Sequence, residues 1–544
     1  MLSRWRSLLF VCLLLPSAWL AWTWRDVPHL GPIHDDSLYL VGAKSIAQRG
    51  EYRILSLPGE PYQTKYPPLY PAYLSLAWLI EPSFPSNLPW AMLLQWLWTP
   101  VLLWLLWRVS RDFGLPEPLR LGLMAAFAFA PYVNFFGIHL MTETMATALA
   151  LAACLLAEKR PGASGLVSGL TFLTRTACVP LLGVIPLLYV LQRRGRDAGV
   201  FLATSLPAFL GWMWWSGSQR MATDDPALLY YTNYLAVYLR DLAVVDLSMV
   251  VWRNTSTFLV SVGQCMVFTL ADNMLTMNVA RLLGVLSLVG TVRMVRKSSW
   301  QQPYVLFSAA YILLLLVWNY PPDPRFVLPV VPLLMAGFLT EVAALHGMVQ
   351  QAKVSKKKDE RVFARIVTPV LAGAACLALY ANVDGALFHL PAQNAGQRQR
   401  VARAQAAYDW VKREAPADAR FYAVFDPLFY LYTGRTAMRL PVPASYAYQE
   451  DRPALKKLTY PVRDFAARRQ LDYVFLSRRE PQSLLEDDER EELWQQAQRE
   501  GKDALVYRRG DVAIFATDAL KRRHPAIHQQ EVDAQHHQQR AAAQ

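Results

Sequence analysis

The chain begins with MLSRWRSLLFVCLLLPSAWLAWTW (residues 1–24), a membrane-length apolar run that has basic residues at Arg4 and Arg6. A secretory signal peptide starts in the same way, but no convincing A-x-A cleavage site precedes the polar segment that follows. We therefore interpret the run as an uncleaved first membrane span, since about twenty apolar residues can cross the hydrocarbon core. The acidic pair Asp35 and Asp36 follows shortly after it.

The composition of the whole chain is that of a membrane protein. Hydrophobic residues make up 54 % of its 544 residues, and they gather in long runs. The formal net charge of +13 is also typical of nucleic-acid-binding proteins. Here, however, the Lys and Arg residues form short clusters between apolar runs, with no basic face interleaved with aromatic residues. We therefore expect a polytopic membrane protein with no nucleic-acid partner.

Hydropathy predicts an α-helical bundle with about eleven membrane spans, the first at residues 1–24. The ten later spans lie near residues 89–107, 119–136, 143–158, 161–176, 177–192, 198–215, 276–294, 303–319, 326–346 and 363–381. Residues 250–271 are also apolar but contain Arg253, Asn254 and Gln264, so we expect an amphipathic external helix there.

Basic clusters predict the orientation of the bundle, because Lys and Arg concentrate in cytoplasmic loops. The clusters lie at residues 108–111, 159–160, 193–196, 293–297 and 353–358. All of them fall inside if the N-terminus is cytoplasmic, and an odd number of spans then places the C-terminus outside. The expected location is a bacterial inner (plasma) membrane, with a periplasmic or otherwise extracytoplasmic C-terminal region.

Residues 1–384 form the predicted transmembrane domain, which includes an external loop at residues 25–88. This loop is expected to hold two short helices. One begins at Asp35, an N-cap candidate, and the other follows the Pro67-Pro68 pair with the sequence LYPAYLSLAWLI.

Residues 385–518 predict a small extracytoplasmic α/β domain. AQAAYDWVKREAP is typical of an amphipathic helix, and RFYAVFD and LDYVFLS of buried strands. ALVYRRGDVAIFAT indicates a hairpin that turns at Arg509-Gly510. Residues 519–544 are polar and low in complexity, so we expect a disordered tail.

Ionisable residues next to apolar sequence gather on the predicted external side. Such residues are costly in a membrane and often functional. Their shared sidedness predicts one external polar site in which carboxylates and cations lie together. The candidates are Asp35, Asp36, Lys65, His139, Glu143, Arg175 and Arg325.

A donor with a lipid tail and a phosphate fits such a site. Lys and Arg pair with the phosphate, and a carboxylate takes a proton from the incoming nucleophile. A sugar linked to polyprenyl phosphate already has a good leaving group, so one base suffices for direct displacement with inversion. The sequence lacks a G-x-x-x-x-G-K-[ST] loop, the signature of ATP-type chemistry. We therefore expect an integral membrane glycosyltransferase whose acceptor is a lipid, a glycan or a protein.

The same residues carry a family resemblance. The first loop contains HDDSLYLVGAKSIAQRGEY (34–52) and GEPYQTKYPPLYPAYLSLAW (59–78), and HLMTETMATALALAACLL (139–156), GLVSGLTFLTRTACVPLL (165–182) and DPRFVLPVVPLL (323–334) follow in order. Together these segments resemble the GT-C type membrane glycosyltransferases, specifically the superfamily of protein O-mannosyltransferases and lipid A aminoarabinose transferases. The resemblance spans roughly residues 1–380 and implies a GT-C-like fold.

The resemblance also implies roles for the matching residues. Asp35 would be the catalytic base, and Asp36 its neighbour or a metal or acceptor contact. Lys65 and Arg325 would contact the donor phosphate, and Glu143 would shape the donor or acceptor pocket. The remaining expected substrate-binding residues are Tyr39, His139 and Arg175.

The sequence departs from the aminoarabinose transferases at two positions. Leu38 stands where those enzymes have an arginine after the acidic pair, and Tyr66 lies between Lys65 and the prolines. Aminoarabinose is therefore not assigned as the sugar.

Other interpretations stay open. Lys65 could also be a lysine at the membrane interface whose ammonium group extends into water, and Asp35 could serve only as the N-cap of a helix. No cofactor is assigned; a divalent cation at His34, Asp35 and Asp36 is left open, although adjacent residues rarely face one ion. A transporter or flippase of a lipid-linked sugar would need ionisable residues near the bilayer midplane. A sensor or scaffold would act through its external domain.

Overall fold

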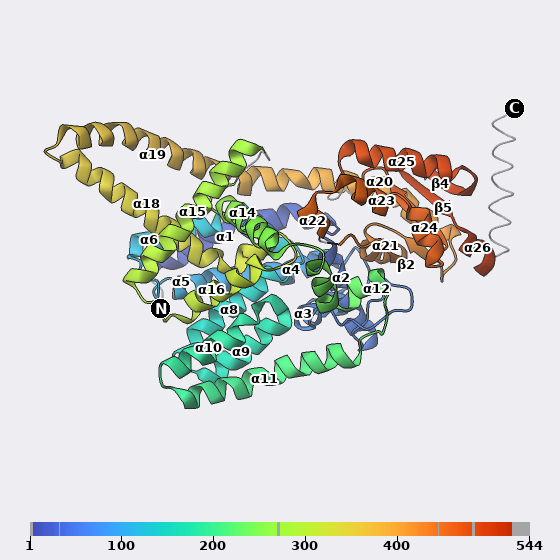
Figure 1. The fold of residues 1–544 in the computed structure, drawn as a ribbon, viewed down its shortest axis with the longest axis horizontal. Coiled ribbons are helices and arrows are strands. Elements are labelled where there is room, and N and C mark those ends of the chain that lie inside the picture. Colours follow the sequence, from blue (N-terminus) through green and yellow to red (C-terminus); the bar gives the residue numbers. More distant parts are fainter. Residues whose placement is uncertain (1–3, 32, 269–272, 444, 481–484, 525–544) are drawn as a thin grey trace.

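The computed structural model describes residues 4–31, 33–268, 273–443, 445–480 and 485–524. These residues form a large assembly of helices and a smaller part that contains a five-stranded sheet. We name them the helical bundle (residues 4–414) and the sheet domain (residues 420–523). Figure 1 shows the two parts side by side along the long axis of the molecule.

Within the described residues, six helices are long and apolar enough to cross a membrane. They are Ser7–Trp24 in α1 (Arg4–Trp24), Leu88–Val109 (α4, Leu88–Trp96, and α5, Trp98–Val109), α11 (Gly195–Ser218), α15 (Met274–Lys297), Pro324–Val354 (α17, Pro324–Val327, and α18, Val331–Val354) and Lys358–Glu414 (α19, Lys358–Asp384, and α20, Leu390–Glu414).

The other predicted spans lie on shorter helices. The pair α6 (Glu117–Ala128) and α7 (Pro131–Ile138) is bent by 56° and makes a seventh span if it is counted as one. The remaining four are α8 (Glu143–Ala157), α9 (Pro161–Thr174), α10 (Pro180–Leu191) and α16 (Pro303–Leu316). A helix therefore covers every predicted span, and the chain is a multi-pass helical membrane protein. The number of about eleven crossings stays a prediction.

Residues 247–266 form α14 (Leu247–Met266), which covers most of the predicted external helix; the end of that range lies outside the described residues. α14 packs closely against α15, because a Cβ atom on Gly263 or Gly284 would collide with the backbone of the opposite helix. The buried amide of Asn254 donates to the carbonyl of Trp318 at 2.7 Å. The helix is thus held by small residues and by a buried hydrogen bond.

The two helices expected in the first loop are present. α2 (His34–Arg49) ends at Gly50, which adopts the left-handed conformation with φ of +66°. α3 (Leu69–Ile80) packs on α2, and the indole Nε1 of Trp78 donates to the carbonyl of Leu40 at 3.0 Å. The expected N-cap is wrong: Ile33 occupies that position, and Asp35 lies in the first turn.

The sheet domain has the strand order β2-β1-β3-β5-β4. β1 (Arg420–Tyr422) pairs in parallel with β2 (Thr436–Met438) and β3 (Tyr473–Ser477), whereas β5 (Val512–Ala516) is antiparallel to β3 and β4 (Leu505–Arg509). The expected hairpin is therefore confirmed, with Gly510 at φ +56° in its turn. The helices of this domain are α21 (Asp426–Thr433), α22 (Ser445–Gln449), α23 (Arg452–Thr459), α24 (Val462–Arg468), α25 (Asp487–Glu500) and α26 (Asp518–Arg523).

One unbroken helix joins the two parts. α19 continues through a π-helical turn at Gly385–His389 into α20, so the predicted boundary at residue 385 falls inside a helix of 57 residues. Of the predicted tail 519–544, the first residues belong to α26, and residues 525–544 lie outside the described part of the chain.

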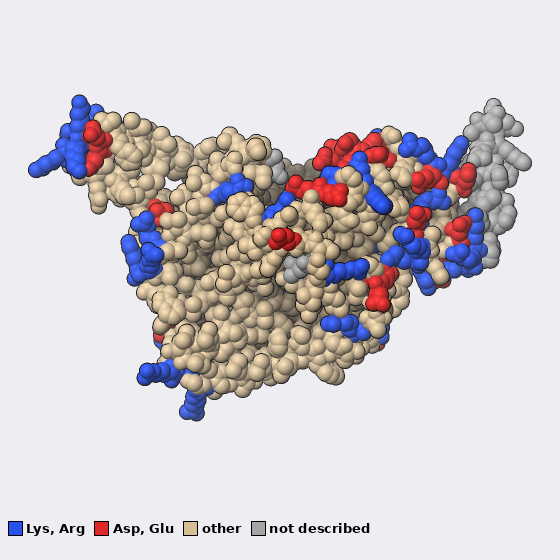
Figure 2. Space-filling model, viewed as in Figure 1, with Lys and Arg blue, Asp and Glu red and all other residues tan. Residues whose placement is uncertain are grey.

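Basic residues lie far from the sheet domain at two turns of the bundle. The turns between α10 and α11 (residues 193–196) and between α18 and α19 (residues 353–358) are at the opposite end of the molecule in Figure 1, and Figure 2 shows Lys and Arg there beyond a broad uncharged surface. The positive-inside rule predicts that this end is cytoplasmic.

Candidate active site

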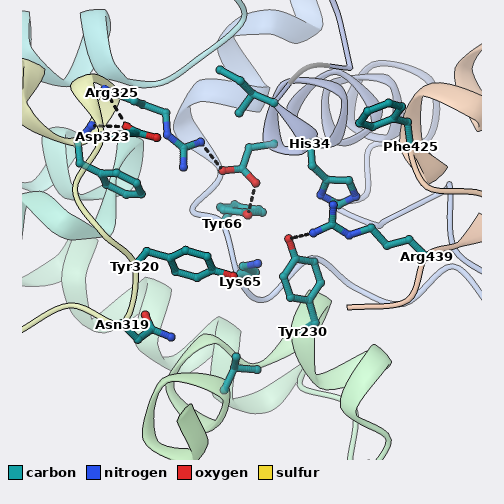
Figure 3. A pocket seen from close by; sticks show the side chains of 14 residues that line it. His34, Lys65, Tyr66, Tyr230, Asn319, Tyr320, Asp323, Arg325, Phe425 and Arg439 are labelled. Carbon is teal, nitrogen blue, oxygen red and sulfur yellow. Dashed lines mark hydrogen bonds and ion pairs between the residues drawn. The ribbon is translucent and has the colours of Figure 1, made fainter. Parts of the chain in front are cut away.

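A cavity of about 340 Å³ lies where the helical bundle meets the sheet domain. Its walls come from α2, from the segment before α3, from α12 (Pro226–Thr232) and α13 (Tyr234–Leu242), from the approach to α17, and from two residues of the sheet domain. Figure 3 shows these side chains pointing toward one another. The ionisable residues that line it are His34, Asp35, Lys65, Tyr66, Tyr230, Tyr320, Asp323, Arg325 and Arg439.

Asp35 is held by two partners at the wall of this cavity. Arg325 Nη1 lies 3.0 Å from its Oδ2, and the hydroxyl of Tyr66 donates to its Oδ1 at 2.7 Å. Burial alone would raise the pKa of Asp35, but Arg325 and Lys65 outweigh it and hold this pKa below its ordinary value. Asp35 is therefore an ionised carboxylate at neutral pH, able to accept a proton.

A chain of alternating charges extends from Asp35 into the bundle. Arg325 Nε lies 3.7 Å from Oε1 of the fully buried Glu143, and Arg175 Nη1 lies 2.6 Å from the same oxygen. Arg175 also donates to the hydroxyl of Thr142 at 3.1 Å. Glu143 thus holds the guanidinium groups of both arginines. Arg325 lines the cavity, whereas Glu143 and Arg175 do not.

Lys65 is the second predicted cation that reaches the cavity. Its Nζ lies 3.9 Å from the ring centroid of Tyr230 and 4.9 Å from that of Tyr66, within cation–π distance. Burial lowers the pKa of Lys65 to about 7, against the opposing effect of Asp35. The ammonium charge of Lys65 is therefore sensitive to pH near neutrality.

Arg439 is a lining residue that the sequence reasoning missed. It follows β2 in the sheet domain, and its Nη2 donates to the hydroxyl of Tyr230 at 2.6 Å. The N–H of Ala437, two residues earlier, donates to the carbonyl of Ser56 in the first loop of the bundle at 2.7 Å. An arginine directly after a three-residue strand gave no signal, because the strand is too short for a pattern of alternation.

The three adjacent residues His34, Asp35 and Asp36 point to three different partners. His34 Nε2 lies 2.8 Å from Oδ1 of Asp426 in the sheet domain. Burial holds the pKa of His34 well below its ordinary value, and the nearby positive charges of Arg439 and Lys65 lower it further. No cluster of three or more His, Cys, Asp or Glu side chains suited to a metal ion occurs in the described residues. The structure does not assemble a cation site from this triplet.

Asp36 is turned away from the cavity. Its carboxylate accepts the N–H of Gly31 at 3.1 Å and the hydroxyl of Ser37 at 2.7 Å. Gly31 has φ of +102°, a conformation that favours glycine, so Asp36 stabilises the turn before α2. Asp36 therefore makes local structural contacts, and it does not contact Arg325 or Tyr66, the partners of Asp35.

Tyr39 and His139 also lie outside the cavity lining. Tyr39 is buried and packs edge-on against Tyr66 with ring centroids 5.2 Å apart, so it supports the residue that holds Asp35. His139 stacks on Phe135 at 3.6 Å, and its Nδ1 lies 2.9 Å from the Phe135 carbonyl. Of the eight predicted site residues, the cavity brings together Asp35, Lys65 and Arg325.

Two crystal structures of ArnT from Cupriavidus metallidurans are similar to the chain. The apo structure superposes with a TM-score of 0.54 at 12 % identity and covers 94 % of this chain and 97 % of that one. The structure bound to undecaprenyl phosphate gives 0.55 at 13 % identity, with 95 % and 98 % covered. The sequence matches no protein-family model and no curated protein. At this identity the likeness shows the fold, so the GT-C-like fold implied by the sequence resemblance is confirmed.

Proposed function

We propose that the chain is an integral membrane glycosyltransferase that moves a sugar from a polyprenyl-phosphate donor to an acceptor hydroxyl or amine. The single observation that carries this proposal is the position of Asp35, in contact with Arg325, in one cavity with Lys65 and Arg439. A fold shared with a protein that binds undecaprenyl phosphate supports the choice of donor.

In the proposed reaction, Asp35 takes the proton from the acceptor while the acceptor oxygen or nitrogen attacks the anomeric carbon. The bond from this carbon to the phosphate oxygen breaks, and the oxygen keeps the electron pair. Polyprenyl phosphate leaves, and the sugar inverts its configuration. The cations of the cavity stabilise the negative charge that grows on the departing phosphate.

Arg325 has two roles in this proposal. Its contact with Asp35 keeps the carboxylate ionised, and its contact with Glu143 fixes the orientation of the guanidinium group. A base held in this way stays in the correct protonation state without moving. The cavity adjoins the sheet domain, so in this proposal the reaction takes place on the extracytoplasmic side of a bacterial inner membrane.

The direct test is to incubate the purified protein with a panel of polyprenyl-phosphate sugars and acceptors and to measure the release of polyprenyl phosphate. We expect release with the cognate pair, and a loss of about 100-fold or more in rate for Asp35→Asn. Wild-type protein that carries lipid-linked sugar across liposomes without consuming it would point to a transporter instead. Normal turnover by Asp35→Asn would reject Asp35 as the base.

A further inference from the structure

The carboxylates near the cavity are unevenly distributed among its cations. Arg325 contacts both Asp35 and Glu143, and Arg175 contacts Glu143. These contacts neutralise the guanidinium groups on the bundle side of the cavity. Asp323 is used locally, since its carboxylate accepts the N–H groups of Arg325 and Phe326 at the start of α17.

Arg439 differs from these residues because it makes no ion pair within the described part of the chain. One of its nitrogens donates to the neutral hydroxyl of Tyr230. Its buried Nε, like the Nε of Arg325 and that of Arg175, has no hydrogen-bond partner among the described residues, but Arg439 also lacks the carboxylate partner that those two arginines have. A buried guanidinium with an unused donor is costly unless an anion completes its contacts. The arrangement therefore favours an anionic ligand at this side of the cavity.

Arg439 and Lys65 lie on the same aromatic ring. The guanidinium carbon of Arg439 is 4.8 Å from the ring centroid of Tyr230, and Lys65 Nζ is 3.9 Å from it. Figure 3 shows Tyr230 below Arg439, with Lys65 in the centre of the cavity and Arg325 on the opposite side. The two cations repel each other, and a phosphate group bound by both would reduce this repulsion.

We propose that Arg439 of the sheet domain binds the phosphate of the lipid-linked donor together with Lys65, which makes the docked sheet domain part of the active site. This inference rests on the proposed function. In this inference the main phosphate contacts are Arg439 and Lys65, and not Arg325, which already contacts the carboxylates of Asp35 and Glu143. An arginine suits this task because its planar group can donate two parallel hydrogen bonds to phosphate oxygens.

The fold positions Arg439 for this purpose. β2 is the edge strand of the sheet that faces the bundle, and the hydrogen bond from Ala437 N–H to Ser56 fixes it against the first loop. On the adjoining helix, Asp426 contacts His34 and accepts the hydroxyl of Tyr231 at 2.9 Å. Arg439 therefore reaches the cavity only while these contacts between the two parts exist.

The test measures equilibrium binding of undecaprenyl phosphate to the purified full-length protein, beside the donor KM and kcat of transfer. We expect Arg439→Ala to weaken binding and to raise KM by about 10- to 100-fold, the usual effect of losing a charge-assisted hydrogen bond. Arg439→Lys should recover part of the affinity, since it keeps the charge and loses the paired donors. Arg508→Ala is the matched control, because this exposed arginine lies on β4 at the other edge of the same sheet.

Tyr230→Phe separates binding from positioning. If Arg439 acted only by holding the Tyr230 hydroxyl, Tyr230→Phe would reproduce the loss seen with Arg439→Ala; we expect its affinity to stay within about threefold of wild type. Unchanged binding by Arg439→Ala, or a fall in thermal stability with unchanged binding, would overturn the inference while leaving the proposed function in place. Wild-type protein that neither binds undecaprenyl phosphate nor transfers sugar would overturn both.

Discussion

His34 and Asp426 join the helical bundle to the sheet domain at the residue next to Asp35, with His34 Nε2 and Asp426 Oδ1 2.8 Å apart. Asp426 is fully buried, and burial raises its pKa to about 7. The contact therefore links the position of α2, which carries Asp35, to the placement of the sheet domain.

We expect Asp426→Ala to loosen this junction. The substitution leaves His34 and Tyr231 without their acceptor, and each buried unsatisfied group costs about 1–3 kcal/mol. Amide hydrogen exchange in α21 should become faster, and transfer activity should fall. Asp511→Ala is the control, since it removes only a more exposed contact with Arg479 in the same domain. Equal exchange rates in the two variants would contradict a junction at Asp426.

Tyr66→Phe removes a hydrogen bond that stabilises ionised Asp35. Without this bond the pKa of Asp35 rises, so the acid limb of kcat/KM should move to higher pH. We expect kcat to fall by about 3- to 10-fold, in line with the loss of one hydrogen bond. Tyr62→Phe serves as a control from the same loop, because the Tyr62 ring packs against Trp215 and does not line the cavity. An acid limb that stays in place would show that Tyr66 does not influence the base.

Lys65 should give donor use an alkaline limit. Its pKa of about 7 means that the ammonium charge is present below this pH and is lost above it, so kcat/KM should decrease as pH rises through about 7. Lys65→Arg should move this limb to much higher pH, because a guanidinium stays protonated. A profile that is identical for wild type and Lys65→Arg would exclude Lys65 as the titrating group.

Glu143→Gln should destabilise the bundle more than the substitution of a surface carboxylate does. The change leaves two buried guanidinium groups without their shared anion, and breaking a buried ion pair costs about 3–5 kcal/mol. The double variant Glu143→Gln/Arg175→Gln should lose less unfolding free energy than the two single variants lose together. Thermal unfolding of the wild type, both single variants and the double variant would measure this difference. Glu341→Gln, which removes a more exposed pair with Arg293, is the control.

The sequence predicted most helices of the bundle correctly, because each apolar run is long enough to be recognised by hydropathy alone. It was less informative in the sheet domain. The pattern of RFYAVFD predicts one strand, but β1 ends at Tyr422 and α21 begins at Asp426, where Pro427 favours the first turn of a helix. β2 was missed because three residues carry no usable periodicity.

The candidate site was predicted in part. Asp35, Lys65 and Arg325 lie in one cavity, as expected. Ionisable side chains are costly in contact with lipid, so those at one end of an apolar bundle tend to lie together in a polar site. Asp36 could not be separated from Asp35 by composition, although neighbours on a helix point about 100° apart. Arg439 was not foreseen, because its role depends on how a distant sheet docks on the bundle.

The continuous helix from Lys358 to Glu414 has a thermodynamic consequence for substrate binding. It is anchored to α1 by the indoles of Trp19 and Trp24, which donate to the carbonyls of Leu387 and Leu390. The sheet domain is thus not tethered by a flexible linker, and the two walls of the cavity are already assembled before a ligand arrives. Little binding energy has to be spent on ordering them, so affinity for the lipid-linked donor should depend mainly on direct contacts.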